Sequence, residues 1–505
     1  MPADSFKSWI LKFTVFVSGA LVMMYEIIGS RVLAPFIGTS TYVWTSLIGV
    51  ILGALSLGYW LGGRIADRRP EVKVLSFVIF LAGGFVSATV LVKDILLSAV
   101  ASASTSLEIK SVVAALLLFA PASVLLGFVT PYAVRLEMTN TADSGKTVGR
   151  LFAYSTVGSI VGTFAAGFVL IPFVGSVRTL YMIAGGLILL SLLLAPLALN
   201  RTNIGIILLF LLAIAGNEFV VAVEKTNGVY DIDTEYSRIR VYRTTDPKNG
   251  REVTALATDP FFTQSAIYSD SDEPVLDYGR FYALAGYFKP GPIKALMIGG
   301  AGYTFPREFL RDSPQAAIDV VEIDPRMTDV ARRFFRLTDD ARMTVIHKDG
   351  REFLNQAEPE KYDVVFIDAF NSLFSVPFQL TTREAVRQID RVLKPDGLVL
   401  FNIGSCISGP GSGFLQAEYR TYQEIFPNIY LVKVHPDFAD ERLQNVVMLA
   451  SKTTLPLEAP NPNPTIAGLL AHRYSSDLPL TKPVLTDDLA PVERYGSIAF
   501  AFYGR

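Results

Sequence analysis

The sequence contains little of what disulfide frameworks and metal centres are built from. Its 505 residues include one cysteine, Cys406, and three widely spaced histidines, His347, His435 and His472. A single cysteine excludes an intrachain disulfide framework and a thiolate metal cluster, and histidines so far apart do not have the spacing of a metal site. We therefore expect cofactor-assisted chemistry without a metal.

The chain also lacks a surplus of charge of either sign. Its net charge is −2 and 18% of its residues are charged, whereas a nucleic-acid-binding protein needs a basic face, so we expect no nucleic-acid partner. In contrast, 51% of the residues are hydrophobic and the mean hydropathy is +0.39. This composition and length predict at least two domains, one of them in contact with a lipid bilayer.

Long apolar runs fill the first 223 residues and predict a multi-pass transmembrane helical domain over residues 1–223. About seven runs are close to the ~20 residues that a bilayer core requires. They lie near 10–30, 43–63, 74–93, 111–131, 151–171, 179–199 and 203–223. We do not expect the first run to be a cleaved signal peptide, because similar runs follow it. The small residues in "GVILGALSLGYWLGG" and "GSIVGTFAAGFVLIP" indicate helix packing faces rather than a substrate path.

Polar residues inside these runs allow two interpretations. Glu26 and Arg31 would be costly facing lipid, so they either pair within the helices as structure or form a site for a cationic ligand. Basic residues mark cytoplasmic ends at Lys7, Lys12, Arg64, Arg68, Arg69, Arg135, Lys146 and Arg150. Seven crossings would then place the rest of the chain outside, unless one run does not span. By content the run most open to doubt is 203–223, which contains Asn217 and Glu218.

The second half alternates short β-branched runs with helical stretches. Residues 224–292 are predicted to form a small β-strand region, with "SRIRVYRT" and "EVTALATD" as a hairpin around the turn Asp246–Gly250. Residues 293–505 are predicted to form a doubly wound, Rossmann-like α/β sheet from "KALMIGG", "AIDVVEID", "MTVIHKD", "YDVVFIDAF" and "GLVLFNIG", closed by "NIYLVKV" and "NVVMLAS".

Ligands bind such sheets outside the carboxyl ends of the strands, and this half places a glycine turn and three acids there. The turn, Gly299–Gly302, follows an apolar strand. Glu322 lies 23 residues after Gly299, where an acid can accept both ribose hydroxyls or can be a solvated carboxylate at a strand end. Asp349 could accept from an adenine amino group or merely form an Asp-Gly turn. Asp368 ends an apolar strand and could act as a base on an amine or as a helix N-cap.

These motifs in combination resemble the spermidine synthases, aminopropyltransferases built on the class I methyltransferase-like fold. The matching segments, from about 230 to 455, are "YSRIRVY", "DPFFTQSAIYSDSDEPVLDYGRFY", "ALMIGGAGY", "VEIDPRM", "KDGREFL" and "YDVVFIDAF". The first 223 residues resemble the membrane extension of some bacterial members, most clearly in "YEIIGSRVLAPFIGTSTYVWTSLIGVILGALSLGYWLGG".

The resemblance implies transfer of an aminopropyl group from decarboxylated S-adenosylmethionine to a diamine, most simply putrescine, giving spermidine and 5′-methylthioadenosine without a tightly bound cofactor. Asp368 would be the base and Tyr278 would orient the amine. The residues implied for the nucleoside are Gln264, Gly299, Gly300, Glu322, Asp349 and Gly350, and those for the substrate are Tyr236, Asn371, Asp487 and Asp488. It also implies a homodimer, and we expect the chain in the cell inner membrane. The side of the catalytic domain is not settled by the sequence: the site of donor synthesis favours the cytosol, against the count of basic residues.

The chain departs from the family pattern in its acids. An aspartate expected in the turn is Gly302, another after the catalytic one is Asn371, and a nucleoside-side glutamine is Ser237. Asp487, Asp488 and Glu493 could compensate by folding over the cleft, or they form an ordinary acidic capping turn. Tyr303 is either a wall that stacks on the ligand or a packing residue. Two other functions stay open: a methyltransferase that uses intact S-adenosylmethionine, and a polyamine transporter or sensor that binds without turnover.

Overall fold

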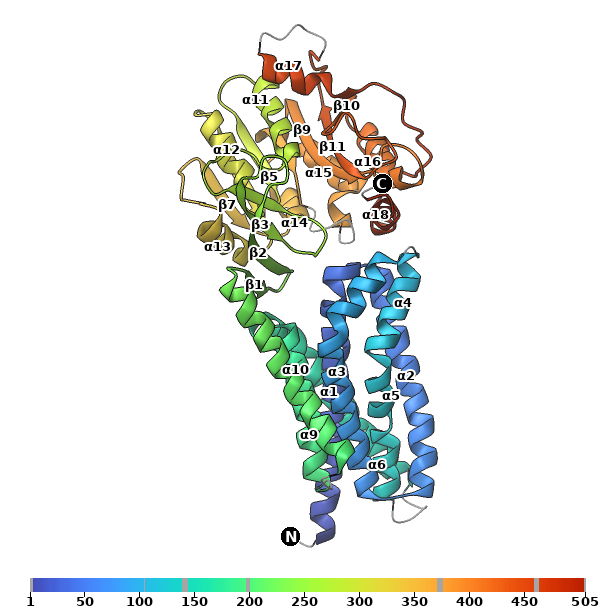
Figure 1. Cartoon of the computed structure of the whole chain (residues 1–505). Coiled ribbons are helices and arrows are strands. Elements are labelled where there is room, and N and C mark those ends of the chain that lie inside the picture. The colour runs from blue at the N-terminus through green and yellow to red at the C-terminus, as the bar shows by residue number, and fades with distance from the viewer. Residues whose placement is uncertain are drawn as a thin grey trace. The chain divides into compact units, whose positions relative to one another are not determined.

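The computed structural model of the chain describes residues 3–103, 105–138, 144–196, 200–369, 376–457 and 463–503. By its internal contacts the chain divides into two compact units (Figure 1). The helical unit comprises Met1–Asn227 together with Ile232–Glu235, and the α/β unit comprises Gly228–Asp231 together with Tyr236–Arg505. The chain therefore passes between the units more than once around residue 230.

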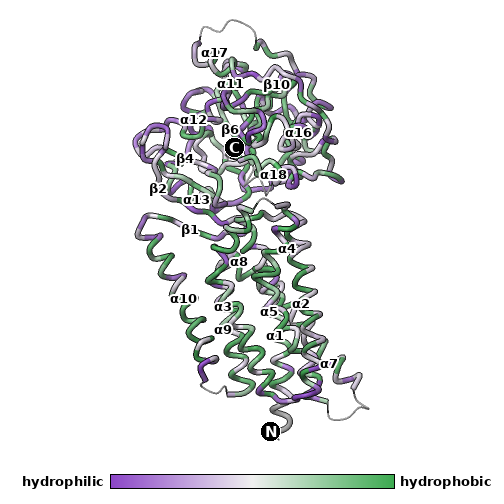
Figure 2. The backbone as a smooth tube through the Cα atoms, turned by 45° about the vertical axis from the view of Figure 1, so that its right-hand side comes forward, coloured by the Kyte–Doolittle hydropathy of each residue, from purple (hydrophilic) through white to green (hydrophobic). Residues whose placement is uncertain are grey.

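Long apolar helices make up the helical unit. They are α1 (Ala3–Ile37), α2 (Thr41–Arg68), α3 (Val72–Ser102), α4 (Leu107–Leu118), α5 (Ala120–Gly127), α6 (Val129–Glu137), α7 (Ser144–Ala165) with the π-helical turn η2 (Ala166–Leu170), α8 (Ile171–Phe173), α9 (Ser176–Leu194) and α10 (Arg201–Thr226). Within the described residues, six helices are long and apolar enough to cross a membrane, and a seventh span is complete if the pair 107–118 and 120–137, bent by 54°, counts as one. Each predicted run overlaps one of these spans, and the helices are mostly hydrophobic in Figure 2.

Small residues bring these helices into close contact, as the sequence predicted. A β-carbon on Gly158 would lie 1.9 Å from the carbonyl oxygen of Phe16, and one on Gly58 would lie 2.1 Å from that of Val124. Any larger residue would force the helices apart, so these glycines are packing positions. Large apolar side chains such as Leu208 are left exposed on the outer surface of the unit.

Polar contacts gather at the two ends of the helical unit. At one end, Glu137 at the end of α6 accepts from Arg150 at 2.5 Å and lies 3.5 Å from Lys12, near the start of α1. At the other end, Arg31 near the end of α1 donates to the carbonyl of Thr234 at 2.6 Å. We call these the N-terminal end and the linker end. Glu26 is half-buried between them in α1.

Segment 232–235 is held to the linker end by a second contact. The Asp233 carboxylate accepts from the backbone N–H of Ser176 at 2.9 Å, where α9 begins. Gly175 precedes this helix with φ +89°. A carboxylate at a helix N-terminus is favourable because it satisfies a free N–H and opposes the helix dipole. We call the contacts of Arg31 and Asp233 the linker clasp.

The α/β unit contains the predicted doubly wound sheet. Eight strands are ordered β12-β10-β11-β9-β8-β5-β6-β7, and the five from β9 to β7 are parallel. Their bounds are β5 (Lys294–Ile298), β6 (Ala317–Glu322), β7 (Met343–His347), β8 (Tyr362–Ile367), β9 (Leu393–Ser405), β10 (Asn428–Lys433), β11 (Gln444–Ser451) and β12 (Arg473–Tyr474). The strand order reverses between β5 and β8, which is where ligands bind in such sheets.

Helices cover both faces of this sheet, which explains why its central strands are mostly apolar (Figure 1). They are α11 (Leu284–Phe288), α12 (Thr304–Asp312), α13 (Pro325–Phe334), α14 (Gly350–Gln356), α15 (Arg383–Val392), α16 (Gly413–Gln423), α17 (Pro464–Ala471) and α18 (Val492–Phe500). Side chains of the central strands, such as Leu296 and Val365, are completely buried. The two predicted closing strands are β10 and β11, which pair antiparallel.

A smaller antiparallel sheet precedes the large one. Its order is β1-β2-β3-β4, from β1 (Tyr230–Asp233), β2 (Arg238–Thr245), β3 (Glu252–Ala257) and β4 (Ser265–Tyr268), followed by the 3₁₀ segment η3 (Asp277–Ala283). The predicted hairpin is β2 and β3. Its turn closes with the N–H of Gly250 donating to the carbonyl of Asp246 at 2.8 Å.

Candidate active site

The glycine turn brings the carboxyl ends of β5 and β8 into direct contact. Gly299 has φ +94°, and a β-carbon there would lie 2.4 Å from the carbonyl oxygen of Asp368. Ala301 and Tyr303 also have positive φ, of 43° and 54°. Two left-handed residues without glycine's freedom indicate a turn held by its surroundings.

Tyr303 is a packing residue beneath this turn. Its side chain is fully buried, and its hydroxyl lies 2.7 Å from Oγ1 of Thr328. A β-carbon on Gly300 would lie 2.7 Å from the Tyr303 ring. Burial raises the pKa of the phenol well above its usual value. Of the two alternatives open from sequence, the structure supports packing rather than an exposed stacking wall.

Glu322 lies at the end of β6 with its carboxylate against the turn. Its Oε2 accepts from the N–H of Gly300 at 2.9 Å and of Ala301 at 3.2 Å, and its Oε1 accepts from Asp324 at 2.9 Å. The side chain is buried, and this burial raises the pKa of its carboxyl. Glu322 thus holds the turn in place from the position where an acid can also accept ribose hydroxyls.

Asp349 follows β7 and caps α14. Its Oδ1 accepts from the N–H groups of Arg351 at 2.8 Å and Glu352 at 3.0 Å. Its Oδ2 has only a long contact, 3.4 Å, with Nε2 of Gln379. A β-carbon on Gly350 would lie 2.8 Å from Cγ2 of Ile298, so this glycine lets α14 approach β5. The capping role is present in the structure, and Oδ2 remains the more available oxygen.

Asp368 follows β8, and its half-buried carboxylate has polar side chains around it. Its Oδ1 accepts from Nδ2 of Asn402 at 3.1 Å, and the Tyr278 hydroxyl also hydrogen-bonds to the carboxylate. The Tyr282 hydroxyl interacts electrostatically with the same carboxylate, but it makes no well-oriented hydrogen bond to any described residue. Burial raises the pKa of Asp368 to about 6, although these hydrogen bonds lower it. A carboxylate with such a pKa can accept a proton near neutral pH.

Asn402 was not singled out from the sequence, although it lies in the predicted strand "GLVLFNIG". It is 7% exposed, and its Oδ1 accepts from Nδ2 of Asn445 on β11 at 2.9 Å. A polar residue near the carboxyl end of an otherwise apolar strand was the available signal. The second asparagine could not be found without the pairing of β9 with β11.

The small sheet contributes one wall of the glycine turn. Ser265, at the start of β4, accepts from the N–H of Gly302 at 3.0 Å. A β-carbon on Gly302 would lie 2.7 Å from Cβ of Ser265, so this position has no room for the aspartate expected there. Gln264 directly precedes Ser265 and is half-buried, which places its backbone beside the turn.

The other substrate candidates are scattered. Tyr236 is 43% exposed just before β2, and Asn371 lies outside the described residues. Asp487 pairs with Arg351 at 2.9 Å and accepts from Thr382 at 2.6 Å, which ties it to the start of α14 and α15. Asp488 is exposed. Glu493 lies in the first turn of α18.

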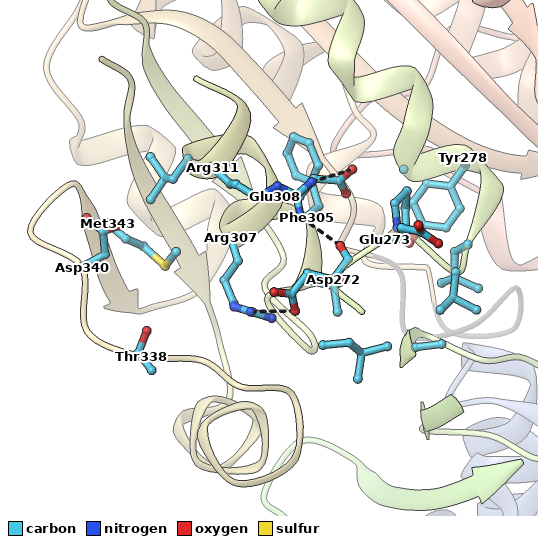
Figure 3. A pocket seen from close by; sticks show the side chains of 18 of the residues that line it. Asp272, Glu273, Tyr278, Phe305, Arg307, Glu308, Arg311, Thr338, Asp340 and Met343 are labelled. Atoms are coloured by element: carbon cyan, nitrogen blue, oxygen red, sulfur yellow. Dashed lines mark hydrogen bonds and ion pairs between the residues drawn. The ribbon is translucent and has the colours of Figure 1, made fainter. Parts of the chain in front are cut away.

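A cavity of about 380 Å³ lies beside Tyr278 (Figure 3). Charged residues that line this cavity form ion pairs with one another: Arg307 pairs with Asp272 at 3.1 Å, and Arg311 lies 3.7 Å from Glu308. Burial raises the pKa of Glu308 to about 7. Tyr278 thus has the cavity on one side and hydrogen-bonds to Asp368.

Comparison with known proteins agrees with this geometry. Residues 281–451 match the model of the spermine/spermidine synthase domain. The chain is 28% identical over 197 residues to the polyamine aminopropyltransferase of Vibrio vulnificus, covering 38% of this chain and 62% of that protein. It is 30% identical over 205 residues to a probable polyamine aminopropyl transferase of Bifidobacterium longum, covering 40% and 43%. These alignments span less than two thirds of either relative.

A longer match includes the helical unit. Polyamine aminopropyltransferase 2 of Ralstonia nicotianae is 24% identical over 454 residues, covering 82% of this chain and 83% of that protein. Among solved structures, a probable spermidine synthase from Corynebacterium glutamicum has a TM-score of 0.40 and 22% identity, covering 48% of this chain and 85% of that chain. The enzyme class that the curated relatives support is the polyamine aminopropyltransferase. The chain is therefore similar to polyamine aminopropyltransferases, with residues 281–451 matching the spermine/spermidine synthase domain and the helical unit lying outside that match.

Proposed function

We propose that this chain transfers an aminopropyl group from decarboxylated S-adenosylmethionine to a diamine such as putrescine. The observation that carries the proposal is the position of Asp368 at the end of β8. Its carboxylate is half-buried with a raised pKa, and its backbone carbonyl packs against the glycine turn at Gly299. The glycine turn and the proposed base, Asp368, therefore lie next to each other where the strand order reverses, between β5 and β8. The names of the relatives support aminopropyl transfer over methyl transfer and over binding without turnover.

In the proposed reaction the nitrogen of the acceptor attacks the methylene carbon bonded to the sulfonium. The N–C bond forms as the C–S bond breaks, the electron pair of the C–S bond returns to sulfur, and neutral 5′-methylthioadenosine leaves. The proton lost by the nitrogen passes to Asp368. Because a sulfonium is a good leaving group, the protein mainly has to align the two substrates and supply a neutral amine.

The remaining residues would position the substrates. Glu322 would accept from the ribose hydroxyls while it holds the turn through the N–H of Gly300, and Oδ2 of Asp349 would accept from the adenine amino group. Tyr278 would orient the amine, because its hydroxyl already touches the Asp368 carboxylate. Gly302 leaves the donor's ammonium without the aspartate seen in the family pattern, so another group must meet it.

Mass spectrometry of products tests this proposal. The purified full chain is given decarboxylated or intact S-adenosylmethionine with putrescine, cadaverine, agmatine or spermidine. Release of 5′-methylthioadenosine with an aminopropylated amine supports it and identifies the acceptor. A methylated product, or tight amine binding without product, would replace it with one of the two other functions.

We further propose that the helical unit crosses a membrane seven times. The bent pair α4–α6 supports a full crossing because its contacts run from one end of the unit to the other. Near its start Lys110 donates to the carbonyl of Ala101 at the end of α3, and at its finish Glu137 meets Lys12. Since α1 runs from the N-terminal end to the linker clasp, the chain leaves the helices at the end opposite the one where it enters.

The distribution of basic residues supports an orientation. The N-terminal end and its loops carry Lys12, Arg64, Arg68, Arg69, Lys73, Arg135, Lys146, Arg150 and Arg201, whereas the linker end carries Arg31, Lys93, Lys110, Arg178 and Lys225. Positive residues favour the cytoplasm, so this geometry favours the extracytoplasmic face for the α/β unit rather than the cytosolic face expected from donor supply.

Cysteine labelling decides between the two faces. Cys406 is buried, so Cys406→Ser gives a background for single exposed cysteines. In intact cells an impermeant maleimide should label Thr105→Cys at the linker end and Asp339→Cys in the α/β unit, but not Lys73→Cys at the N-terminal end. The reverse pattern would reverse the orientation, and equal labelling of Lys73→Cys and Asp339→Cys would exclude seven crossings. The homodimer stays a prediction, testable by light scattering in detergent.

A further inference from the structure

A pair of buried amides stands behind Asp368. Asn402 on β9 donates through Nδ2 to Oδ1 of Asp368 at 3.1 Å, and Asn445 on β11 donates through Nδ2 to Oδ1 of Asn402 at 2.9 Å. The strand register produces this row. Ile367 pairs with Phe401, so Asp368 and Asn402 are the next positions on neighbouring strands. Asn402 pairs with Val447, and Asn445 lies two residues away on the same face of β11.

Hydrogen-bond chemistry fixes the orientation of the two amides in this row. An ionised carboxylate only accepts hydrogen bonds, so Asn402 must present its NH₂ group to Asp368. Its oxygen then faces Asn445, which must present its own NH₂ group. If Asn402 were flipped, its oxygen would face an oxygen of Asp368 and its NH₂ group would face the NH₂ group of Asn445. Asn445 therefore fixes the orientation of the Asn402 amide, and Asn402 fixes one oxygen of Asp368.

Sheet stability alone does not account for these residues. Asn402 is 7% exposed, and Val447, its partner on β11 on the same face of the sheet, is a fully buried apolar residue. Burying an amide among such residues costs free energy unless its hydrogen bonds are made, and asparagine is depleted in strands. A β-branched residue would suit β9 better, so the amide has a role that an apolar side chain cannot fill.

We propose that Asn402 and Asn445 are positioning residues for Asp368, which they hold in its ionised form with one carboxylate oxygen occupied and the other directed to the acceptor amine. This inference rests on the proposed function, because it assigns to Asp368 the role of proton acceptor. Asn402 acts by direct contact, and Asn445 acts only through Asn402. Both stabilise the charged carboxylate, so the loss of either makes the base harder to ionise.

The pH dependence of aminopropyl transfer tests the proposal in the full chain. Among the described residues, the titratable side chains that act on Asp368 are Tyr278 and Tyr282 of η3, and neither titrates near neutral pH. Asn402→Ala should shift the acidic limb of kcat/KM upward by about one pH unit, the effect of losing one hydrogen bond to a charged group. Asn445→Ala should shift it less, in the same direction. The acceptor amine also titrates, but its titration is the same for every variant. It therefore does not contribute to the difference in limb position between variants.

Two further measurements separate positioning from structure. The double variant should resemble Asn402→Ala alone, because Asn445 acts through that residue. Asn428→Ala is the control: it removes an amide from β10 that donates to the carbonyl of Ser451, away from Asp368, and should leave the limb in place.

The outcomes are distinct. Lower rates with an unmoved acidic limb in both Asn402→Ala and Asn445→Ala would overturn the proposal and leave these residues a structural role. Additive shifts in the double variant would overturn the indirect role of Asn445. Absence of any transfer by the unaltered chain would instead overturn the proposed function.

Discussion

The carbonyl oxygen of Asp368 occupies the space beside Gly299 where any other residue would place its β-carbon, 2.4 Å away. The two strand ends that build the candidate site can therefore meet only if position 299 has no side chain. Gly299 also needs its positive φ of 94°, which other residues adopt only at a cost.

Gly299→Ala should destabilise the α/β unit by about 2–4 kcal/mol, because it adds a clash to the backbone strain. Gly291→Ala is the matched control: Gly291 has φ +102° but open space around its β-carbon position, so it should lose only about 1 kcal/mol. Thermal unfolding of both variants measures the difference. Equal losses would mean that the contact with Asp368 has no energetic consequence.

Asp368→Asn should lower the rate of aminopropyl transfer by about 10²-fold or more while donor binding is largely kept, since the amide cannot accept the proton. Single-turnover rates and a donor-binding titration check the two parts separately. Asp363→Asn, which removes a carboxylate on β8 that pairs with Lys394 of β9, serves as the control. Unchanged turnover in Asp368→Asn would remove the base assignment.

The rate should fall as the pH drops below about 6, because burial raises the pKa of Asp368 to about 6 and only the ionised form accepts a proton. At pH 5 about a tenth of the plateau rate should remain. Glu308, which lines the cavity beside Tyr278 and has a pKa raised to about 7, is another acid that could produce such a limb. Glu308→Gln should leave the acidic limb at the same pH. If the limb disappeared in that variant, it would have to be assigned to Glu308 instead of Asp368.

Glu418 on α16 should make the protein less stable as the pH rises. Among the described residues neither of its buried carboxyl oxygens has a hydrogen-bond partner, and burial raises its pKa well above the usual value. Below the ordinary pKa both states hold the proton. Above it the unfolded state ionises first, so stability falls by about 1.4 kcal/mol per pH unit until the folded-state pKa is reached.

Glu418→Gln cannot ionise and should lack this decline. Thermal unfolding of both proteins between pH 5 and 8 provides the comparison, with exposed Glu424→Gln as a control from the same part of the chain. If stability depended on pH in the same way in Glu418→Gln and in the unaltered protein, burial of the Glu418 carboxyl would have no net effect on its ionisation.

Local pattern was enough to predict the strands, the glycine turn and the acids that end β6, β7 and β8. The apolar runs of a parallel sheet and the rule that ligands bind at its carboxyl edge depend only on short stretches of sequence. The burial of Tyr303 could not be predicted, because it depends on a positive φ and on Thr328, which is 25 residues away.

The remaining features of the site depend on contacts between residues that are far apart in the sequence. The Asn445–Asn402–Asp368 row exists only because β11 inserts antiparallel beside β9, and nothing local in "NVVMLAS" indicates its neighbour. Asp487 could be recognised as an acid near the C-terminus, but its partner Arg351 lies 136 positions earlier. Side-chain partners set by tertiary structure are thus the part of the site that sequence reasoning missed.

The linker clasp has a practical consequence for dissecting this protein. Residues 228–231 belong to the α/β unit, where Asp231 pairs with Arg238 at 2.5 Å, while residues 232–235 belong to the helices through Arg31 and Ser176. A truncation that starts at 236 discards the partner of Arg238, and one that starts at 228 leaves Asp233 without the helix it caps. No single cut site therefore yields a soluble fragment with all its native contacts, and swapping helical halves between relatives requires the whole 228–238 segment to match both sides.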